Sequence, residues 1–256
     1  MAKLVVENLL VCYGGLKAVN DVSLETREGE VLSVVGPNGA GKTTLFNAVT
    51  KHVKPTGGKI IFDGKDLTRL SAHEVSKTGI IRTFQKRSFF PSITVLENVL
   101  MGQHMTISPS LLDFILLSRM KEKEAHALKR ALELLEFTGL SDVKDNIAKT
   151  LPYGKQRLLG VAIALAANPK LLLLDEPCAG SNSSECEYMI DVIKKINDTG
   201  IPIILVEHHM KVVMRLSERV IVLNSGAKMA EGTPQEIQNN PEVIEAYLGK
   251  RGVESA

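Results

Sequence analysis

The sequence has almost no excess of charge of either sign. Lysine and arginine together number 31 against 29 aspartates and glutamates, which gives a net charge of +2 at pH 7. A chain so balanced offers no bulk electrostatic attraction to nucleic acid or to an anionic lipid surface. We therefore expect no nucleic-acid partner, and we expect any membrane role to depend on a protein partner.

Long apolar runs, an export signal and a cysteine framework are also missing. Apolar runs such as residues 114–117 and 171–174 are far shorter than the roughly 20 residues that a membrane-spanning helix needs. The amino terminus lacks the basic start and the apolar stretch of a secretion signal. Cys12, Cys178 and Cys186 are odd in number and lack metal-ligand spacing, as expected of reduced thiols. We expect a soluble cytosolic chain without disulfides or zinc.

The length and apolar content suffice for one large domain, or for a core with an inserted subdomain: 256 residues, 44% of them apolar. Short β-type runs separated by Gly-Gly and Asp-Gly turn signals dominate the first third. They cover residues 3–6, 23–26, 31–35, 59–62 and 80–84. From about 95 to 146 the pattern is helical, because Ala125, Leu128, Leu132 and Leu135 recur at helix spacing among charged residues. We predict an inserted helical subdomain there.

After residue 150, strand-like and helix-like segments alternate. The expected strands are 170–175, 202–206 and 219–223, and the expected helices between them are 188–197 and 210–216. This alternation predicts a mainly parallel sheet with helices on its faces, the α/β class. Pro234 and Pro241 suit helix starts, so two short helices should close the chain.

The strongest local signal is a glycine-rich segment between a strand and a helix. It matches glycine, four residues, glycine, lysine, then serine or threonine, and it reads Gly36, Pro37, Asn38, Gly39, Ala40, Gly41, Lys42, Thr43. Apolar residues 31–35 precede it and a helical stretch from Thr44 follows, which is the context of a P-loop. Glycines let successive amides face one phosphate, Lys42 reaches the terminal phosphates, and Thr43 offers a hydroxyl to Mg²⁺. We count Thr44 with the nucleotide-binding residues; the alternative is a glycine-rich turn with an incidental lysine.

A P-loop alone does not separate kinases, GTPases and motor ATPases. The apolar run 171–174, followed by Asp175 and Glu176, adds a second element, a central strand that ends in two carboxylates at the nucleotide-binding edge of the sheet. Asp175 would hold Mg²⁺, usually through water, and Glu176 would polarise the attacking water as general base. A strand followed by an acidic helix cap is the alternative, and the P-loop argues against it.

These motifs, in this order, resemble the ATP-binding cassette (ABC) family over essentially the whole chain. The resemblance makes Tyr13 the residue that stacks on adenine, Gln85 the glutamine that contacts Mg²⁺ or the attacking water, and His208 the switch histidine at the γ-phosphate. An ordinary strand tyrosine and a solvent-facing glutamine are the alternatives for the first two, and neighbouring His209 competes with His208. Residues 179–182 occupy the position of the family's D-loop.

The family's signature segment, typically Leu-Ser-Gly-Gly-Gln, is altered here. It reads Leu151, Pro152, Tyr153, Gly154, Lys155, Gln156. Proline in place of serine removes a hydroxyl and a backbone amide, both of which are possible donors to a γ-phosphate. The chain is most similar to the ATPases of bacterial branched-chain amino-acid importers, in Arg-Thr-Phe-Gln at 82–85, in the Tyr-Gly of the signature and in the tail from Gly232 to Gly249.

The resemblance implies an α/β P-loop NTPase (RecA-like) core with an N-terminal antiparallel β subdomain and an inserted helical subdomain. We expect a single ABC ATPase domain over residues 1–256, with its core in 1–90 and 151–256 and the helical subdomain in about 91–150. The implied ligands are ATP and Mg²⁺. The implied partners are a second cassette, identical or different, and transmembrane permease subunits at the inner face of the cell membrane. A soluble non-transport ABC ATPase, a small-molecule kinase and an ATP-binding subunit with weak hydrolysis are the alternatives.

Overall fold

The structure is a computed structural model that describes residues 2–83, 89–103 and 117–248. Its centre is a six-stranded sheet in the order β10-β9-β3-β8-β7-β6, in which all neighbours are parallel except β9 and β10. The strands are β3 (Val31–Val35), β6 (Ile80–Arg82), β7 (Leu171–Asp175), β8 (Ile203–Val206), β9 (Arg219–Asn224) and β10 (Ala227–Gly232). The predicted parallel sheet is confirmed, but β7, which we expected to be central, is second from the edge.

Strand β7 is apolar up to its last residue because its side chains point alternately into two cores. Leu172 and Leu174 of β7 belong to one hydrophobic cluster, and Leu171 and Leu173 belong to another. A parallel sheet covered on both faces buries every position along such a strand. In β7 the first polar residue, Asp175, therefore comes only where the strand ends.

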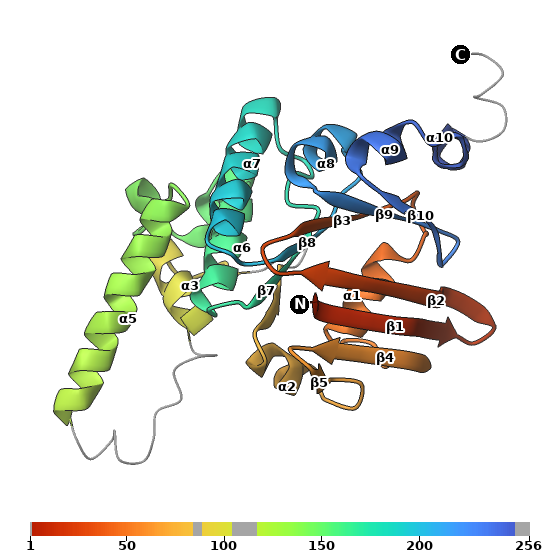
Figure 1. The fold of residues 1–256 in the computed structure, drawn as a ribbon. Coiled ribbons are helices and arrows are strands. Elements are labelled where there is room, and N and C mark those ends of the chain that lie inside the picture. The colour runs from red at the N-terminus through yellow and green to blue at the C-terminus, as the bar shows by residue number, and fades with distance from the viewer. Residues whose placement is uncertain (1, 84–88, 104–116, 249–256) are drawn as a thin grey trace.

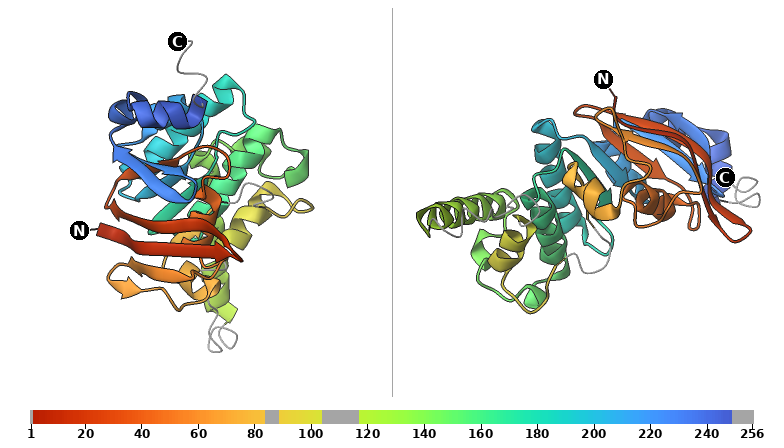
Figure 2. Two further views of the ribbon diagram at one scale, coloured as in Figure 1. Left: turned by 90° about the vertical axis from the view of Figure 1, so that its right-hand side faces the viewer. Right: turned by 90° about the horizontal axis from the view of Figure 1, so that it is seen from below.

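A four-stranded antiparallel sheet, in the order β2-β1-β4-β5, packs its apolar side chains toward the first sheet and α1. Its strands are β1 (Ala2–Tyr13), β2 (Leu16–Arg27), β4 (Gly57–Phe62) and β5 (Lys65–Asp66). Figures 1 and 2 show this sheet and helix α5 at opposite ends of the molecule. The antiparallel β subdomain is thus present, and its strand β1 ends on Tyr13.

Helices cover the six-stranded sheet and extend beyond it. They are α1 (Lys42–Val49), α2 (Ala72–Lys77), α3 (Val95–Gly102), α5 (Leu117–Phe137), α6 (Tyr153–Ala166), α7 (Ser183–Asp198), α8 (Met210–Leu216), α9 (Pro234–Gln238) and α10 (Pro241–Leu248). Short 3-10 turns lie at Ser141–Val143 and Ala148–Thr150. The helix starts predicted at Pro234 and Pro241 are confirmed, and so is the predicted fold class.

The helix that the apolar spacing predicted is confirmed as α5, and only part of its apolar spacing is buried. Of the four residues in the predicted stripe only Leu135 is buried, while Leu128 and Leu132 are 42% and 39% exposed. Among the α5 side chains that the structure describes, the other buried ones are Ala131 and Leu134. Helix α5 contacts α3 and α6 near its C-terminal end and extends away from the core (Figure 1). Spacing predicts the helix but does not show how far along it the neighbouring helices reach.

The chain segments that enter and leave the helical part pair with each other. Thr94 and Ile147 form an antiparallel bridge, and the Ala148 amide donates to the carbonyl oxygen of Ile93 at 2.9 Å. The helical part is thus joined to the core through a two-stranded neck. Among the helices that the structure describes, none combines the length and the apolar character needed to cross a membrane.

Candidate functional site

The P-loop connects β3 to α1, and at two positions only glycine fits. The φ angles are 151° at Gly36 and 101° at Gly41, both outside the range that other residues readily adopt. A Cβ on Gly36 would lie 2.2 Å from the carbonyl oxygen of Leu223, and one on Gly41 would lie 2.4 Å from that of Ala18. Neighbouring backbone therefore fixes the curvature that the motif predicted.

Lys42 opens α1, and its ammonium group folds back over the loop. Its Nζ donates to the carbonyl oxygens of Gly36 at 2.6 Å and of Pro37 at 3.0 Å. Burial lowers the pKa of Lys42, while the charges of Glu176 and Asp175 raise it in part. The fold thus places the predicted lysine and the two predicted carboxylates in one electrostatic environment.

Asp175 ends β7 and is almost fully buried, which raises the pKa of its carboxyl, while Arg82 acts in the opposite direction. Its Oδ2 accepts a hydrogen bond from Nη2 of Arg82 at 2.7 Å. Its Oδ1 is buried and has no hydrogen-bond partner among the described residues. Such an oxygen marks a place for a water or an ion. One carboxylate, the Thr43 hydroxyl and nucleotide phosphates form the kind of oxygen set that Mg²⁺ prefers, so the residues present fit the predicted metal.

Glu176 leaves β7 with the backbone in the left-handed region, at φ 48°. Strain of this type costs roughly 1–3 kcal/mol and is concentrated at functional sites. Its Oε1 lies 3.7 Å from Nδ1 of His208. His209 is instead the N-cap residue of α8. Of the two candidate histidines, His208 is therefore the one beside the predicted general base.

Glu207 is a residue of this site that the motif search missed. It is fully buried, its Oε1 accepts from the backbone amide of Cys178 at 3.2 Å, and its Oε2 accepts from the amide of His208 at 3.1 Å. One carboxylate therefore connects the segment after Glu176 to the segment that carries His208. The sequence offers one signal for this role, a glutamate directly after the apolar strand β8. It does not show that one partner, Cys178, comes from a distant loop. Burial and the charge of Glu207 both raise the pKa of Cys178, so this thiol stays protonated.

A cavity of about 560 Å³ lies over the P-loop. Tyr13 of β1, residues 38–44 and Glu176 line it, together with the β9–β10 turn at Ser225. The volume is in the range of small-molecule sites. Tyr13 is 49% exposed, so much of its ring is accessible. Three predicted parts of the site, Tyr13, the P-loop and Glu176, thus line the same cavity. Gln85 lies outside the described residues.

The signature segment lies apart from this cavity, at the start of α6. Of the described residues that line the cavity, none belongs to 151–156. Pro152 is the N-cap residue of α6 and makes no side-chain cap, and Tyr153 is 47% exposed. A Cβ on Gly154 would lie 2.5 Å from Oε1 of Glu185, so a larger residue here would displace the Glu185 side chain.

The remaining signature side chains make contacts close to α6. Lys155 forms an ion pair with Asp142 at 2.7 Å, and Nε2 of Gln156 donates to the carbonyl oxygen of Leu151 at 2.8 Å. In the D-loop segment, Asn182 caps α7 by accepting from the Glu185 amide at 2.9 Å. Within one chain, these segments stabilise local structure and do not reach the nucleotide cavity.

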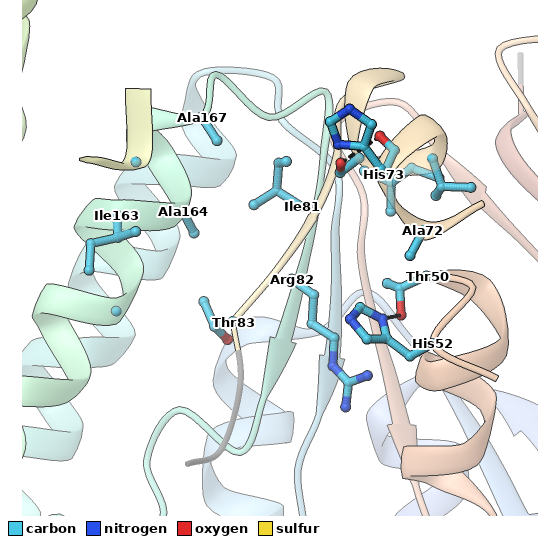
Figure 3. Close-up of a pocket in the computed structure, with 15 residues that line it drawn as sticks. Thr50, His52, Ala72, His73, Ile81, Arg82, Thr83, Ile163, Ala164 and Ala167 are labelled. Atoms are coloured by element: carbon cyan, nitrogen blue, oxygen red, sulfur yellow. Dashed lines mark hydrogen bonds between the residues drawn. The ribbon is translucent and has the colours of Figure 1, made fainter. Parts of the chain in front are cut away.

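A second pocket, of about 420 Å³, lies between α6 and the segment formed by α2 and β6. Figure 3 shows Ile163 and Ala164 of α6 on one side and His52 and His73 on the other, with Arg82 extending from β6 between them. The pocket lies along β6, whose last residue, Arg82, donates a hydrogen bond to Asp175.

Comparison with known proteins agrees with this geometry. Residues 19–179 match the family model described as ABC transporter, and residues 227–253 match the model described as branched-chain amino acid ATP-binding cassette transporter. The high-affinity branched-chain amino acid transport ATP-binding protein LivG of Salmonella typhimurium is 43% identical over 249 residues, which cover 96% of this chain and 98% of the relative. The match over residues 19–179 includes the P-loop, the signature segment and the carboxylates of Asp175 and Glu176.

Two solved structures are also similar. An ATP-binding cassette of an ABC transporter in its ADP conformation has a TM-score of 0.86 at 32% identity, covering 98% of this chain and 100% of the other. A dimeric cassette in a post-hydrolysis state, bound to ADP and phosphate, has a TM-score of 0.78 at 28% identity, covering 90% of this chain and 98% of the other.

Proposed function

This chain belongs to the ABC transporter family of ATP-binding cassettes, and on that premise we propose that it is the ATP-hydrolysing motor subunit of an importer for branched-chain amino acids. The observation that carries the proposal is the arrangement of the site: one cavity joins Lys42 to Glu176, and Glu176 lies beside His208. The substrate class rests on the relatives' names and on the match of residues 227–253.

In the proposed mechanism, the P-loop amides and Lys42 hold the terminal phosphates of ATP, and Tyr13 holds its base. Mg²⁺, when bound beside Thr43 and Asp175, neutralises phosphate charge. Glu176 orients a water molecule and accepts its proton, and the neighbouring His208 holds the phosphate that this water attacks. Each of these residues either stabilises charge or positions a reacting group, and catalysis of phosphoryl transfer depends mainly on these two effects.

The proposed motor is a pair of cassettes, because the signature segment does not line the chain's own cavity. A similar cassette forms a dimer in its post-hydrolysis state. We propose that the signature of each chain faces the P-loop of the other. The catalytic residues of this chain are complete, whereas Pro152 removes two donors from the signature that it contributes, so we propose a different cassette with an intact signature as its partner.

We expect Pro152→Ser to raise ATP turnover of the purified chain alone by roughly 10- to 100-fold, because a charge-assisted hydrogen bond to phosphate contributes about 1–3 kcal/mol. Mixing the unmodified chain with its partner cassette should also raise turnover. Pro152→Ala is the matched control, because alanine restores the backbone amide but supplies neither a hydroxyl nor a side chain that can cap α6. The heterodimer is contradicted if the unmodified chain alone matches the mixture and Pro152→Ser changes nothing.

The proposed membrane partner is a pair of permease subunits that bind this chain at the inner face of the membrane, where ATP is available. Phe89 and Phe90, which precede α3, are candidates for this contact because an exposed apolar patch marks a partner surface. Phe89 is partly buried against the core, whereas Phe90 is 56% exposed. Buried Asn98 holds the Phe90 backbone, accepting from its amide at 2.7 Å and donating to its carbonyl oxygen at 3.0 Å. An exposed ring on a backbone that is held in this way makes Phe90 the better candidate for contact with the permease.

We expect Phe90→Ser to leave nucleotide binding and thermal stability near those of the unmodified chain, since surface changes usually cost no more than about 0.5 kcal/mol. Co-purification with the permease subunits and the ATPase stimulation they cause should both fall. Leu132→Ser, at an exposed position of α5, is the matched control. Unchanged stimulation would show that Phe90 lies outside the interface, and loss of folding would show that it belongs to the core.

The overall function is tested by measuring ATP turnover and amino-acid uptake in membrane vesicles, with and without the permease subunits. We expect turnover to depend on the permease and uptake to depend on ATP. Turnover that is independent of any membrane subunit would favour a non-transport ABC ATPase. Tight ATP binding with negligible turnover in every assembly would favour an ATP-binding subunit.

A further inference from the structure

Arg82 forms a buried ion pair with the predicted metal-binding carboxylate. It ends β6, which pairs in parallel with β7, so its side chain lies next to the strand that ends on Asp175. Nη2 lies 2.7 Å from Oδ2 of Asp175, and the two side chains are 5% and 1% exposed. A buried pair of this kind is retained only with good geometry and further hydrogen bonds.

The rest of the guanidinium group is anchored on α1, the helix that the P-loop opens. Nη1 donates to Oδ1 of Asn47 at 2.6 Å, and the guanidinium carbon lies 5.4 Å from the centre of the Phe46 ring. Arg82 therefore connects the P-loop helix to the end of β7. A planar fork with several donors can hold both partners at fixed positions, which a lysine ammonium cannot do.

The ion pair leaves one oxygen of Asp175 available. Oδ2 is engaged by Arg82, whereas Oδ1 is buried without a hydrogen-bond partner among the described residues. Because the carboxylate is fixed on one side, the direction of Oδ1 is fixed as well. Partners that orient a metal ligand in this way commonly change metal affinity by about 10- to 100-fold.

We propose that Arg82 is a positioning residue for the metal site: it holds Oδ2 of Asp175 so that Oδ1 is presented to Mg²⁺ or to a water bound to it. This inference rests on the proposed ATPase function and adds a residue that neither the P-loop nor the carboxylate motif contains. It also makes the geometry of the metal site depend on α1 through Asn47.

The test measures calorimetrically the affinity for a non-hydrolysable ATP analogue, once with Mg²⁺ and once with a chelator. For Arg82→Gln, we expect the affinity for the analogue in chelator to stay near that of the unmodified chain. The factor by which Mg²⁺ increases this affinity should fall by about 10- to 100-fold. Arg82→Lys should lose less, since it keeps the charge. Arg130→Gln, at a half-exposed position of α5, is the matched control and should change neither value. An unchanged Mg²⁺ enhancement, or an equal loss with and without Mg²⁺, would overturn the proposal.

If Arg82→Gln alone fails to fold, the double variant with Asp175→Asn removes both buried charges. It is then compared with Asp175→Asn alone. We expect no further loss of Mg²⁺ enhancement, because the two side chains act through one interaction. An additional loss in the double variant would contradict the proposal. Failure of the unmodified chain to bind the analogue at all would instead contradict the proposed function and not the role of Arg82.

Discussion

Replacing Glu176 by glutamine should leave ATP bound and lower its hydrolysis by about 10²–10⁴-fold, the usual contribution of a general base. Glutamine keeps the size of the side chain and one acceptor oxygen, but it cannot take a proton at neutral pH. The metal-binding carboxylate, Asp175, is not altered, so Mg²⁺ and nucleotide should still bind.

The position of Glu176 explains why the effect should be large. Its left-handed backbone and its place in the wall of the P-loop cavity fix where its carboxylate lies, 3.7 Å from His208. No other described carboxylate lines that cavity. Single-turnover hydrolysis by the chain with its partner cassette is the appropriate measurement, with nucleotide affinity measured in parallel.

Glu133→Gln is the matched control, because Glu133 lies half-exposed on α5, far from the P-loop. It should leave turnover unchanged. If Glu176→Gln also hydrolyses ATP at the normal rate, a different group is the base. Loss of nucleotide binding together with turnover would indicate instead that Glu176 supports the fold of the site.

Replacing Lys42 by alanine should weaken ATP binding by roughly 10- to 1,000-fold, since each charge-assisted hydrogen bond contributes about 1.5–3 kcal/mol. The ammonium group is placed over the loop by its bonds to Gly36 and Pro37, and it lines the cavity. Among the described residues that line the cavity, Lys17 is the other cation, but it lies on β2 and not on the loop itself.

The affinity for ATP of Lys42→Ala should be compared with that of Lys194→Ala, an exposed lysine on α7 where alanine suits the helix. Thermal unfolding of both variants shows whether the fold is intact. Retained tight binding in a folded Lys42→Ala variant would contradict the assignment of the phosphate site. A loss of binding in Lys194→Ala would show that the assay reports general damage.

The predictions that the structure and the comparisons confirm rest on residues that are neighbours in the chain. The P-loop is one such case, because its glycines, its lysine and the flanking strand and helix follow one another. The parallel sheet is another, since a strand that is buried on both faces needs a run of apolar residues such as Leu171–Leu174. Local spacing was sufficient for these features.

The pattern on α5 shows what local spacing leaves open. A stripe with Leu128 and Leu132 is correct as helix periodicity, but the side chains that become buried are Ala131 and Leu134. Burial depends on which neighbour approaches the helix and from which side, and α3 and α6 approach only near its C-terminal end.

By itself, the sequence determined the fold class, the glycine-rich loop that joins β3 to α1 and the two carboxylates that follow the apolar run of β7, because each depends on a short run of residue types. Only the tertiary structure decided which side chains complete the site. It paired Arg82 with Asp175, joined Cys178 to His208 through Glu207, and placed His208 instead of His209 beside Glu176. These contacts join residues from different strands and loops, so they are set by the register of the sheet and by the path of each loop, which no single stretch of sequence specifies.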